Sequence, residues 1–213
     1  MNCEAEQGVV NSLLTHLGPA LCQGIQEGLE AAAKMAWLEA KSHHQGTLSC
    51  ALGQARHFHS NEQFTIALDA AGVPHNPLRG NDIVIGQCGP LLLGRFQTRQ
   101  QGWNNARRSS LRLKLAAHNE WLERLVQPGL FEQRLDTAHI AVFFVSVFSG
   151  SIALQPDRLS SVEIAVMDTK LSERLFSEPV IQFLGRYAQP ADQEDLVRVR
   201  LKKSARKQQD SQP

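Results

Sequence analysis

The hydrophobic positions of the first forty residues recur every three or four residues, which is the spacing of one apolar face on a helix. These positions are Leu14, Leu17, Leu21, Ile25, Leu29 and Ala32. Gly18-Pro19 interrupts the series, so the pattern predicts two helices rather than one. In the second helix, Gly24 and Gly28 lie one turn apart. They are either two tolerated glycines or a place where another helix, from this chain or from a second copy, approaches closely.

A short helix and a β-hairpin are predicted next along the chain. Ser60 and Gln63 have the spacing of a helix-capping box, and the apolar run that follows them ends at Gly72. Beyond this helix, the apolar runs 83–85 and 91–93 flank a cluster of turn residues. Two apolar runs around such a cluster predict a hairpin.

The second half of the chain alternates between helical and extended patterns. Residues 105–126 predict a basic amphipathic helix, and the unbroken β-branched and aromatic run 138–148 predicts a strand covered on both faces. Residues 161–167 alternate as a second strand. The stripe of apolar residues over 171–187, interrupted by Pro179, predicts a further helix.

This order of elements predicts one α/β domain with a central mixed β-sheet flanked by helices. A length of 213 residues leaves no clear room for two domains, because a typical domain has ~150 residues. We divide the chain into an N-terminal helical region (1–58) packed on the core, an α/β core (59–201) and a disordered basic tail (202–213). A last short strand is expected near 196–201.

Composition narrows the class of protein. Hydrophobic residues make up 42% and charged residues 20%, as in a packed globule. The first residues carry acids where a signal peptide needs positive charge, and no apolar run approaches the ~20 residues that span a bilayer. We therefore expect a cytoplasmic protein that does not enter a membrane. The cysteines, which lack CxxC spacing and are expected to be free thiols, are Cys3, Cys22, Cys50 and Cys88.

Charge is distributed unevenly, although the formal net charge is only +1. The segment from Ile83 to Asn119 contains no acid. Residues in it that could contact phosphates, stack on bases or read base edges are Arg95, Arg99, Trp103, Asn105, Arg107, Arg108, Arg112 and Lys114. The segment predicts nucleic-acid binding, to DNA in preference to RNA, and a solvated basic helix face is the alternative. The basic tail would add non-specific attraction to phosphates.

Residues 60–187 resemble, in the order of their elements, the core of the restriction-endonuclease-like PD-(D/E)XK superfamily. Gly80-Asn81-Asp82 enters the hairpin as the first acid of that family does. The resemblance implies a nuclease-like fold in which this acid and a following acid-x-Lys motif hold Mg²⁺ for phosphodiester hydrolysis. In this sequence, Arg95 and Gln97 stand in the place of the acid-x-Lys motif.

If the hairpin turn is centred on Cys88-Gly89, Asp82 lies opposite Arg95. An ion pair between them would occupy the place of the dication. We therefore expect a nucleic-acid-associated protein with a nuclease-like but catalytically disabled domain, with no cofactor.

An active Mg²⁺-dependent endonuclease is the first alternative, and whether the chain is an enzyme stays open. Its catalytic residues would be Asp82 with Gln97, or Asp157 with Asp168 and Lys170. Only the second set matches the letters of the family motif. The eleven steps between Asp157 and Asp168 would span roughly 36 Å if extended, which argues against a shared metal. Otherwise, Asp168 or Thr169 would cap a helix that begins near Leu171.

Two further hypotheses use other residues. His57 and His59 would share one face of a strand near His43, His44 and Cys50, and zinc would accept such ligands. Exposed loop histidines are the commoner explanation. The second hypothesis is a protein-interaction or assembly subunit, in which the N-terminal helices with the two closely spaced glycines form a homodimer.

Overall fold

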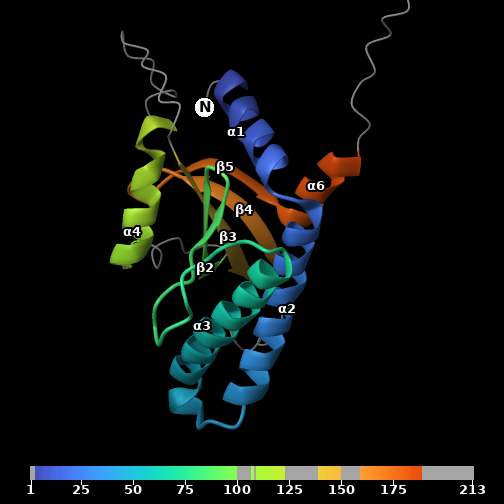
Figure 1. The fold of residues 1–213 in the computed structure, drawn as a ribbon. Coiled ribbons are helices and arrows are strands. Elements are labelled where there is room, and N and C mark those ends of the chain that lie inside the picture. Colours follow the sequence, from blue (N-terminus) through green and yellow to red (C-terminus); the bar gives the residue numbers. More distant parts are fainter. Residues whose placement is uncertain (1–2, 100–106, 108, 123–138, 150–158, 189–213) are drawn as a thin grey trace, which may run out of the picture.

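The computed structural model describes residues 3–99, 107, 109–122, 139–149 and 159–188. Its helices are α1 (Cys3–His16), α2 (Pro19–Ala40), α3 (Gln45–Ala70), α4 (Ser110–Ala116) and α6 (Val180–Gly185), as Figure 1 shows. Its strands are β1 (Gly86–Cys88), β2 (Leu91–Arg99), β3 (Ile140–Phe148), β4 (Ser161–Met167) and β5 (Arg174–Pro179).

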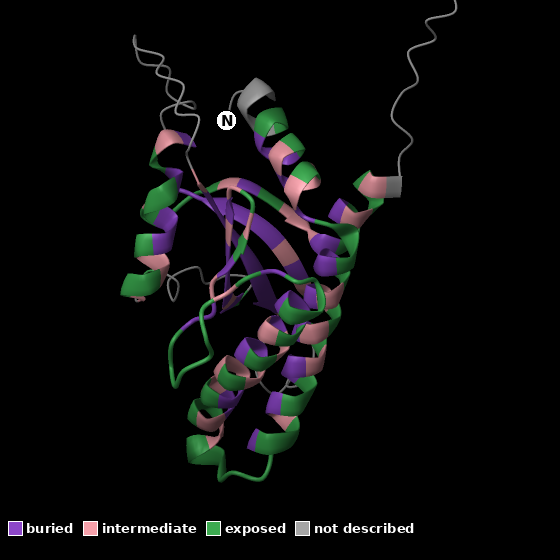
Figure 2. Cartoon of the chain, in the orientation of Figure 1, coloured by how far each residue is buried: buried purple, intermediate pink, exposed green. Residues whose placement is uncertain are grey.

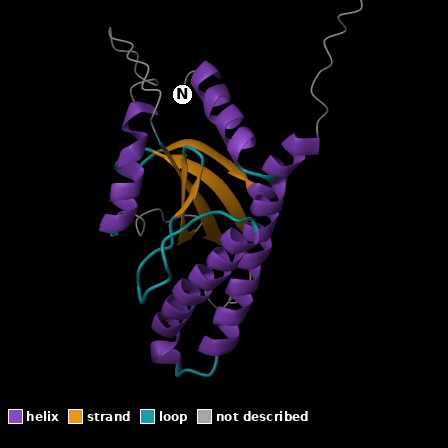
Figure 3. Cartoon of the chain, in the orientation of Figure 1, coloured by secondary structure: helices purple, strands orange, loops and turns teal. Residues whose placement is uncertain are grey.

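The strands form one mixed sheet in the order β1-β2-β3-β4-β5. Strand β2 is antiparallel to β1 and parallel to β3, and β4 is antiparallel to both β3 and β5. Helix α4 lies on one side of the sheet, and α1, α2, α3 and α6 lie on the other (Figure 3). The predicted α/β architecture with a mixed sheet flanked by helices is therefore confirmed.

Alternating side chains of the strands supply two cores, one on each face of the sheet. The face toward α1, α2, α3 and α6 is built from Leu91, Leu93, Ile140, Val142, Phe144, Val162, Ile164 and Val166. The face toward α4 is built from Phe96, Ala141, Phe143, Val145, Val147, Ala165 and Met167. Every residue of β3 is buried, as its unbroken apolar sequence predicts (Figure 2).

The two N-terminal helices are confirmed, and the chain breaks between them at Gly18, which precedes Pro19. A Cβ atom added at Gly28 would lie 3.2 Å from the carbonyl oxygen of Gln63, and one added at Gly24 would lie 3.7 Å from Cβ of Ala67. The close helix approach is thus made by α3 of the same chain. A homodimer stays a prediction, but these two glycines do not provide its contact.

Helix α3 begins at Gln45, so the capping box expected at Ser60 is wrong, and Ser60 is buried in the middle of the helix. The cap is His44, whose Nδ1 accepts a hydrogen bond of 3.2 Å from the backbone N–H of Gly46. The domain boundary expected at residues 58–59 lies inside this helix. The helix ends as predicted, just before Gly72, whose positive φ of 66° suits glycine.

The hairpin is confirmed, but its first strand is β1 (Gly86–Cys88) rather than residues 83–85. The helix predicted over 171–187 is wrong in its first half, where β5 pairs with β4. The helical part, α6, begins only at Val180, directly after Pro179.

Some of the predicted elements fall wholly or partly on residues outside the described ranges. These are the tail (202–213), the strand near 196–201 and both ends of the helix expected over 105–126. In the described part of that segment, α4 covers Ser110–Ala116 and a 3₁₀ turn follows it.

Candidate functional site

Arg95 is buried between the sheet and α3, although the sequence predicts it at a nucleic-acid-binding surface. Only 2% of its surface is exposed, and it is the largest side chain buried to this extent among the described residues. It points toward α3 because it lies two residues after Leu93, on the same face of β2, whereas Phe96 is on the face toward α4. The placement of Arg95 on the surface is therefore wrong.

Acceptors from α3 hold the guanidinium of Arg95. Its Nε and Nη2 donate hydrogen bonds of 3.0 and 2.5 Å to Oδ1 of Asn61, and Nη2 also donates a bond of 2.5 Å to the carbonyl oxygen of His57. The other end of the Asn61 amide, Nδ2, donates a bond of 2.8 Å to the carbonyl oxygen of Asp82. A neutral amide thus links the buried cation to the loop before β1.

The expected ion pair between Asp82 and Arg95 is not formed. The hairpin pairs Gly86 with Leu93, and continuing that register would align Arg95 with Val84, but β1 begins only at Gly86. Asp82 itself is exposed in the loop that precedes β1. The predicted register is wrong because the turn lies one residue further along than the centre assumed at Cys88-Gly89.

Positive charge is crowded around this network. Arg112, from α4, donates a hydrogen bond of 3.4 Å from Nε to the carbonyl oxygen of Arg95. Burial, and secondarily the charge of Arg112, lower the pKa of Arg95 to about 9. Burial likewise lowers the pKa of Arg112. Burial also lowers the pKa of His57, with Arg95 and Arg112 as further causes.

The low pKa of His57 predicts a loss of stability in acid. The unfolded chain takes up a proton on this side chain near pH 6.5, whereas the folded chain does so only at a lower pH. Between those values the unfolded state binds more protons, so stability falls as the pH decreases. We expect the free energy of unfolding, measured with urea, to decrease from pH 7 to pH 5, and His57→Gln to flatten this dependence.

His75 supplies the opposite control. A hydrogen bond with the backbone oxygen of Asn76 and another with Asp69 raise its pKa. Its stabilising contribution is therefore present in acid and is lost as the pH rises through the folded pKa. The variant His75→Gln should make the loss between pH 7 and pH 5 steeper. An unchanged pH dependence in His57→Gln would contradict the assignment.

A second group of cations lies where the parallel strands β2 and β3 end. The guanidinium carbon of Arg56, on α3, lies 3.6 Å from the ring centroid of Phe148. Burial, and then the charge of Arg99, lower the pKa of Arg56 to about 10. Arg99 is exposed and is the β2 partner of Phe148 in the sheet. Ligands of open α/β sheets commonly bind beyond the carboxyl ends of parallel strands.

The remaining nucleic-acid candidates divide into three groups. Arg107 and Lys114 are exposed, and Nε of Arg107 donates a hydrogen bond of 3.3 Å to the carbonyl oxygen of Leu171. Arg112 is only partly exposed and is turned toward β2, so the alternative of a solvated basic helix face does not hold at this position. Trp103, Asn105 and Arg108 lie outside the described residues.

The catalytic candidates occupy separate positions in the sheet. Asp82 precedes β1 at one edge, whereas Asp168 follows β4, with β2 and β3 between those strands. The side-chain oxygen of Gln97, on β2, is buried and has no hydrogen-bond partner in the described part of the chain. Asp157 lies outside the described residues.

Asp168 closes the turn between β4 and β5. Its carboxylate accepts backbone hydrogen bonds from Ser172 (2.5 Å) and Glu173 (2.9 Å), and a further one from the Ser172 hydroxyl. Lys170 is exposed in the same turn. The expectation that Asp168 caps a helix is therefore wrong, because the chain turns back into β5.

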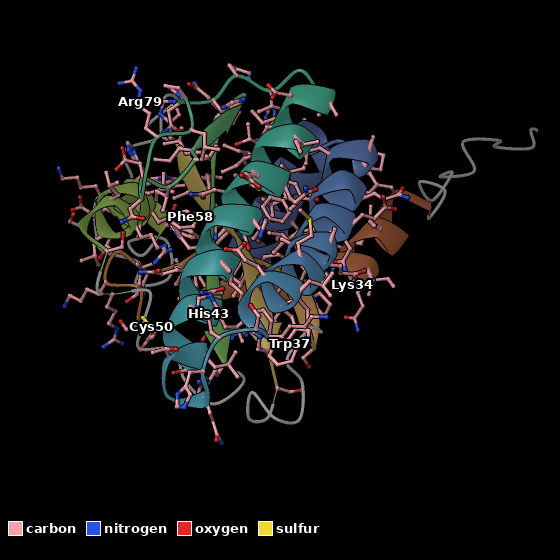
Figure 4. The ribbon with its side chains drawn as sticks, turned by 90° about the horizontal axis from the view of Figure 1, so that it is seen from below. Lys34, Trp37, His43, Cys50, Phe58 and Arg79 are labelled. Carbon is pink, nitrogen blue, oxygen red and sulfur yellow. The ribbon has the colours of Figure 1, made fainter. Side chains whose placement is uncertain are left out.

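The proposed histidine site is built differently from the prediction. His57 and His59 lie on the helix α3, not on a strand, and His59 is placed between Glu39 of α2 (2.7 Å) and Glu62 (3.4 Å). Figure 4 shows His43 and Cys50 apart from each other at the end of the α2–α3 pair. Across the described ranges, no group of three or more His, Cys, Asp and Glu residues is placed to hold a metal ion.

The sequence interpretation missed Asn61 and Arg56. Residues 45–59 were not assigned to a helix, so Arg56 was not expected to face the sheet, and Asn61 was expected only at the start of the helix capped by Ser60. The available signal was the position of Asn61 three residues before the buried Phe64, which places a polar side chain on the same side of the helix as the core.

No helix in the described part of the chain combines the length and the apolar character that crossing a bilayer requires. Comparisons of the chain with known protein families, with curated proteins and with solved structures find no match.

Proposed function

We propose that this chain is a nucleic-acid-associated protein that binds the phosphate backbone, preferably of DNA, through the exposed cations Arg99, Arg107 and Lys114 of its acid-free segment. One observation carries the proposal. None of the described cations of the segment 83–119 forms an ion pair with a carboxylate of the described residues. Cations that no carboxylate of the described residues neutralises are available to phosphates, whose contacts supply most of the affinity for nucleic acid.

The proposal includes binding without cleavage. Arg95 and Gln97 stand where the family that the sequence resembles has the acid and the lysine of its metal site. The buried guanidinium of Arg95 disfavours a dication nearby by charge repulsion. An active nuclease would instead need Asp82, and Mg²⁺-dependent nicking of plasmid that Asp82→Asn abolishes would overturn this part of the proposal.

The role of these three cations can be tested by fluorescence anisotropy with a labelled DNA duplex at low salt. Replacing Arg99, Arg107 and Lys114 with glutamine should weaken binding by about tenfold or more. It should also reduce the salt slope by about 0.9 for each phosphate that the variant no longer neutralises. The same titration with a matched RNA duplex tests the preference for DNA.

A control variant with the same net charge separates binding by these three cations from general electrostatic attraction. Lys34, Arg174 and Arg186 lie on other elements than these three cations, and Figure 4 shows Lys34 on the outside of α2. Arg174 and Arg186 already form ion pairs of 2.8 Å with Glu163 and Glu178. Replacing these three cations with glutamine should leave binding nearly unchanged. Equal losses in both triple variants, or no binding by the natural chain, would contradict the proposal.

A further inference from the structure

Strand β2 has a neighbouring strand along only part of one of its edges. β3 pairs with β2 over its whole length, from Leu91 to Arg99, whereas β1 pairs with it only from Leu91 to Leu93. Within the described ranges, no other strand adjoins the rest of that edge. The stretch from Gly94 to Arg99, on the side away from β3, is therefore an open edge of the sheet.

The direction of one hydrogen bond shows which backbone groups lie along this open edge. The carbonyl oxygen of Pro90 accepts a bond of 2.9 Å from the N–H of Ile140, the first residue of β3. Backbone groups alternate between the two edges of a strand, so the even-numbered residues of β2 turn theirs to β3. Arg95, Gln97 and Arg99 thus present their N–H and C=O groups to the open edge.

Unpaired backbone groups lie at the centre of the open edge, on Gln97. Its N–H and C=O form no hydrogen bond with the side of the chain that faces away from β3, among the described residues. The carbonyl oxygens on either side of it are only weakly engaged. That of Arg95 accepts a bond of 3.4 Å from Nε of Arg112, and that of Arg99 accepts one of 3.2 Å from the Thr98 hydroxyl. Both bonds are long enough to be replaced by those of an added strand.

The chain before β1 is held in a way that keeps it from covering the open edge. Oδ1 of Asn76 accepts a bond of 2.5 Å from the N–H of Ile85, and its Nδ2 donates one of 3.1 Å to the carbonyl oxygen of Ile83. Nδ2 of Asn61 donates to the carbonyl oxygen of Asp82. These side-chain bonds engage the backbone at three positions before β1, so the hairpin does not extend along β2.

Helices flank the open edge on both faces of the sheet, and each carries an exposed apolar side chain. Arg95 contacts α3 at the carbonyl oxygen of His57, and the next residue, Phe58, is 42% exposed. Arg112 contacts the edge from α4, and the preceding residue, Leu111, is 38% exposed. Figure 4 shows Phe58 on the side of α3 that faces α4. An added strand would therefore find apolar surface next to both of its faces.

The charge beside the open edge is positive. Arg99 is exposed at its end, and Arg112 lies against the carbonyl oxygen of Arg95. The sequence from Ile83 to Asn119, which supplies β1, β2 and α4, contains no acid. We infer that an extended segment of a partner protein, with apolar and acidic side chains, pairs with the open edge as an additional strand. In this mode of recognition, main-chain hydrogen bonds give affinity and the side chains give specificity.

A second copy of the chain is disfavoured as the occupant of this edge. Pairing two open edges would bring the cations of both copies together, and like charges directly opposite each other are destabilising. Charged side chains protect natural edge strands against such pairing. A nucleic acid lacks the peptide groups that form a ladder, so the inference goes beyond the proposed function and does not depend on it.

The inference can be tested by fluorescence anisotropy of the full chain with a fluorescein-labelled peptide, Val-Val-Glu-Glu-Val-Val. The paired order places valine and glutamate on both faces of the added strand. We expect saturable binding. The same peptide with alternate backbone nitrogens methylated keeps its charge but loses main-chain donors, and should bind about tenfold more weakly or less. Val-Val-Lys-Lys-Val-Val should not bind, because its charge has the sign of the edge.

A pair of variants at one position separates the backbone from the side chain. Gln97→Pro removes an outward N–H and leaves the bonds to β3 in place, since proline is tolerated where the N–H of an edge strand faces outward. It should weaken binding of the acidic peptide by about tenfold or more. Gln97→Ala removes the same side chain, keeps the N–H and should bind as the natural chain does. Both variants should retain duplex binding, so the two proposals fail independently.

Several results would overturn the inference. They are no binding of the acidic peptide, equal binding of its methylated or lysine form, and equal losses in Gln97→Ala and Gln97→Pro. If Gln97→Pro does not fold, the methylated peptide still decides the question on the natural chain. Sedimentation that shows a dimer of the natural chain and a monomer of Gln97→Pro would assign the edge to a second copy, which also overturns the inference.

Discussion

Asn61→Ala is expected to lower the free energy of unfolding by about 3–5 kcal/mol, which is the cost of removing one partner from a buried charged group. The alanine would leave Nε of Arg95 without its acceptor and would remove one of the two acceptors of Nη2. It would also remove the donor to the carbonyl oxygen of Asp82. Urea unfolding monitored by tryptophan fluorescence measures the loss.

The double variant Asn61→Ala/Arg95→Met tests whether the buried charge is the cause. Methionine fills a similar volume without a charge, and replacing buried ionic groups by apolar ones of the same size is often neutral. We therefore expect the double variant to be more stable than Asn61→Ala alone. If the second substitution only adds to the loss of stability, that loss comes from packing around Asn61 and not from the Arg95 guanidinium that has lost its acceptor.

Asn61→Asp provides a matched comparison. The carboxylate keeps the acceptor for Arg95 and adds an ion pair, but it cannot donate to Asp82. A loss smaller than that of the alanine variant is expected.

The parts of the fold that the sequence predicts well are those in which local preference and tertiary packing agree. The run that becomes β3 is β-branched and aromatic throughout and is buried on both faces. Pro19 can only begin a helix, and it does so at α2. The hairpin at Gly89 is equally local, because its positive φ of 58° suits glycine.

The errors arise where tertiary contacts override local preference. The first part of α3 contains Gly46, Gly53 and several histidine and glutamine residues, a composition that does not predict a helix, but it packs against α2 through Leu52 and Ala55. The spacing over 171–179 also fits a helix, but Asp168 closes a turn there and the edge of β4 pairs with β5.

The candidate site was only half predictable for the same reason. An acid-free basic segment is visible in the sequence, but which of its arginines face water depends on the strand register. Arg95 lies on the α3 side of β2, and one residue of register shift would have placed it on the α4 side. The position of Arg56 could not be predicted, because α3 was not expected to reach the ends of β2 and β3.

Asn119→Ala should lower the free energy of unfolding by about 3 kcal/mol, because it would leave buried backbone groups of β3 and β4 without hydrogen-bond partners. Asn119 is fully buried in the 3₁₀ turn after α4. Its Nδ2 donates to the carbonyl oxygens of Ala141 (3.0 Å) and Met167 (2.8 Å), and its Oδ1 accepts from the Ala141 N–H (2.7 Å). The paired ladder of β3 and β4 stops at Val142, so this amide continues it by one residue.

Asn119→Asp separates the donors of this amide from its acceptor. Aspartate can still accept from Ala141 N–H, but its second oxygen would face two carbonyl oxygens, so a loss as large as that of the alanine variant is expected. Hydrogen exchange should show the Ala141 amide losing protection in the alanine variant and keeping more of it in the aspartate variant. His118→Ala removes an exposed neighbour in the same turn and should change stability by less than about 0.5 kcal/mol. A similar loss in His118→Ala and Asn119→Ala would mean that the turn, and not the amide, holds β3 and β4 together at this end.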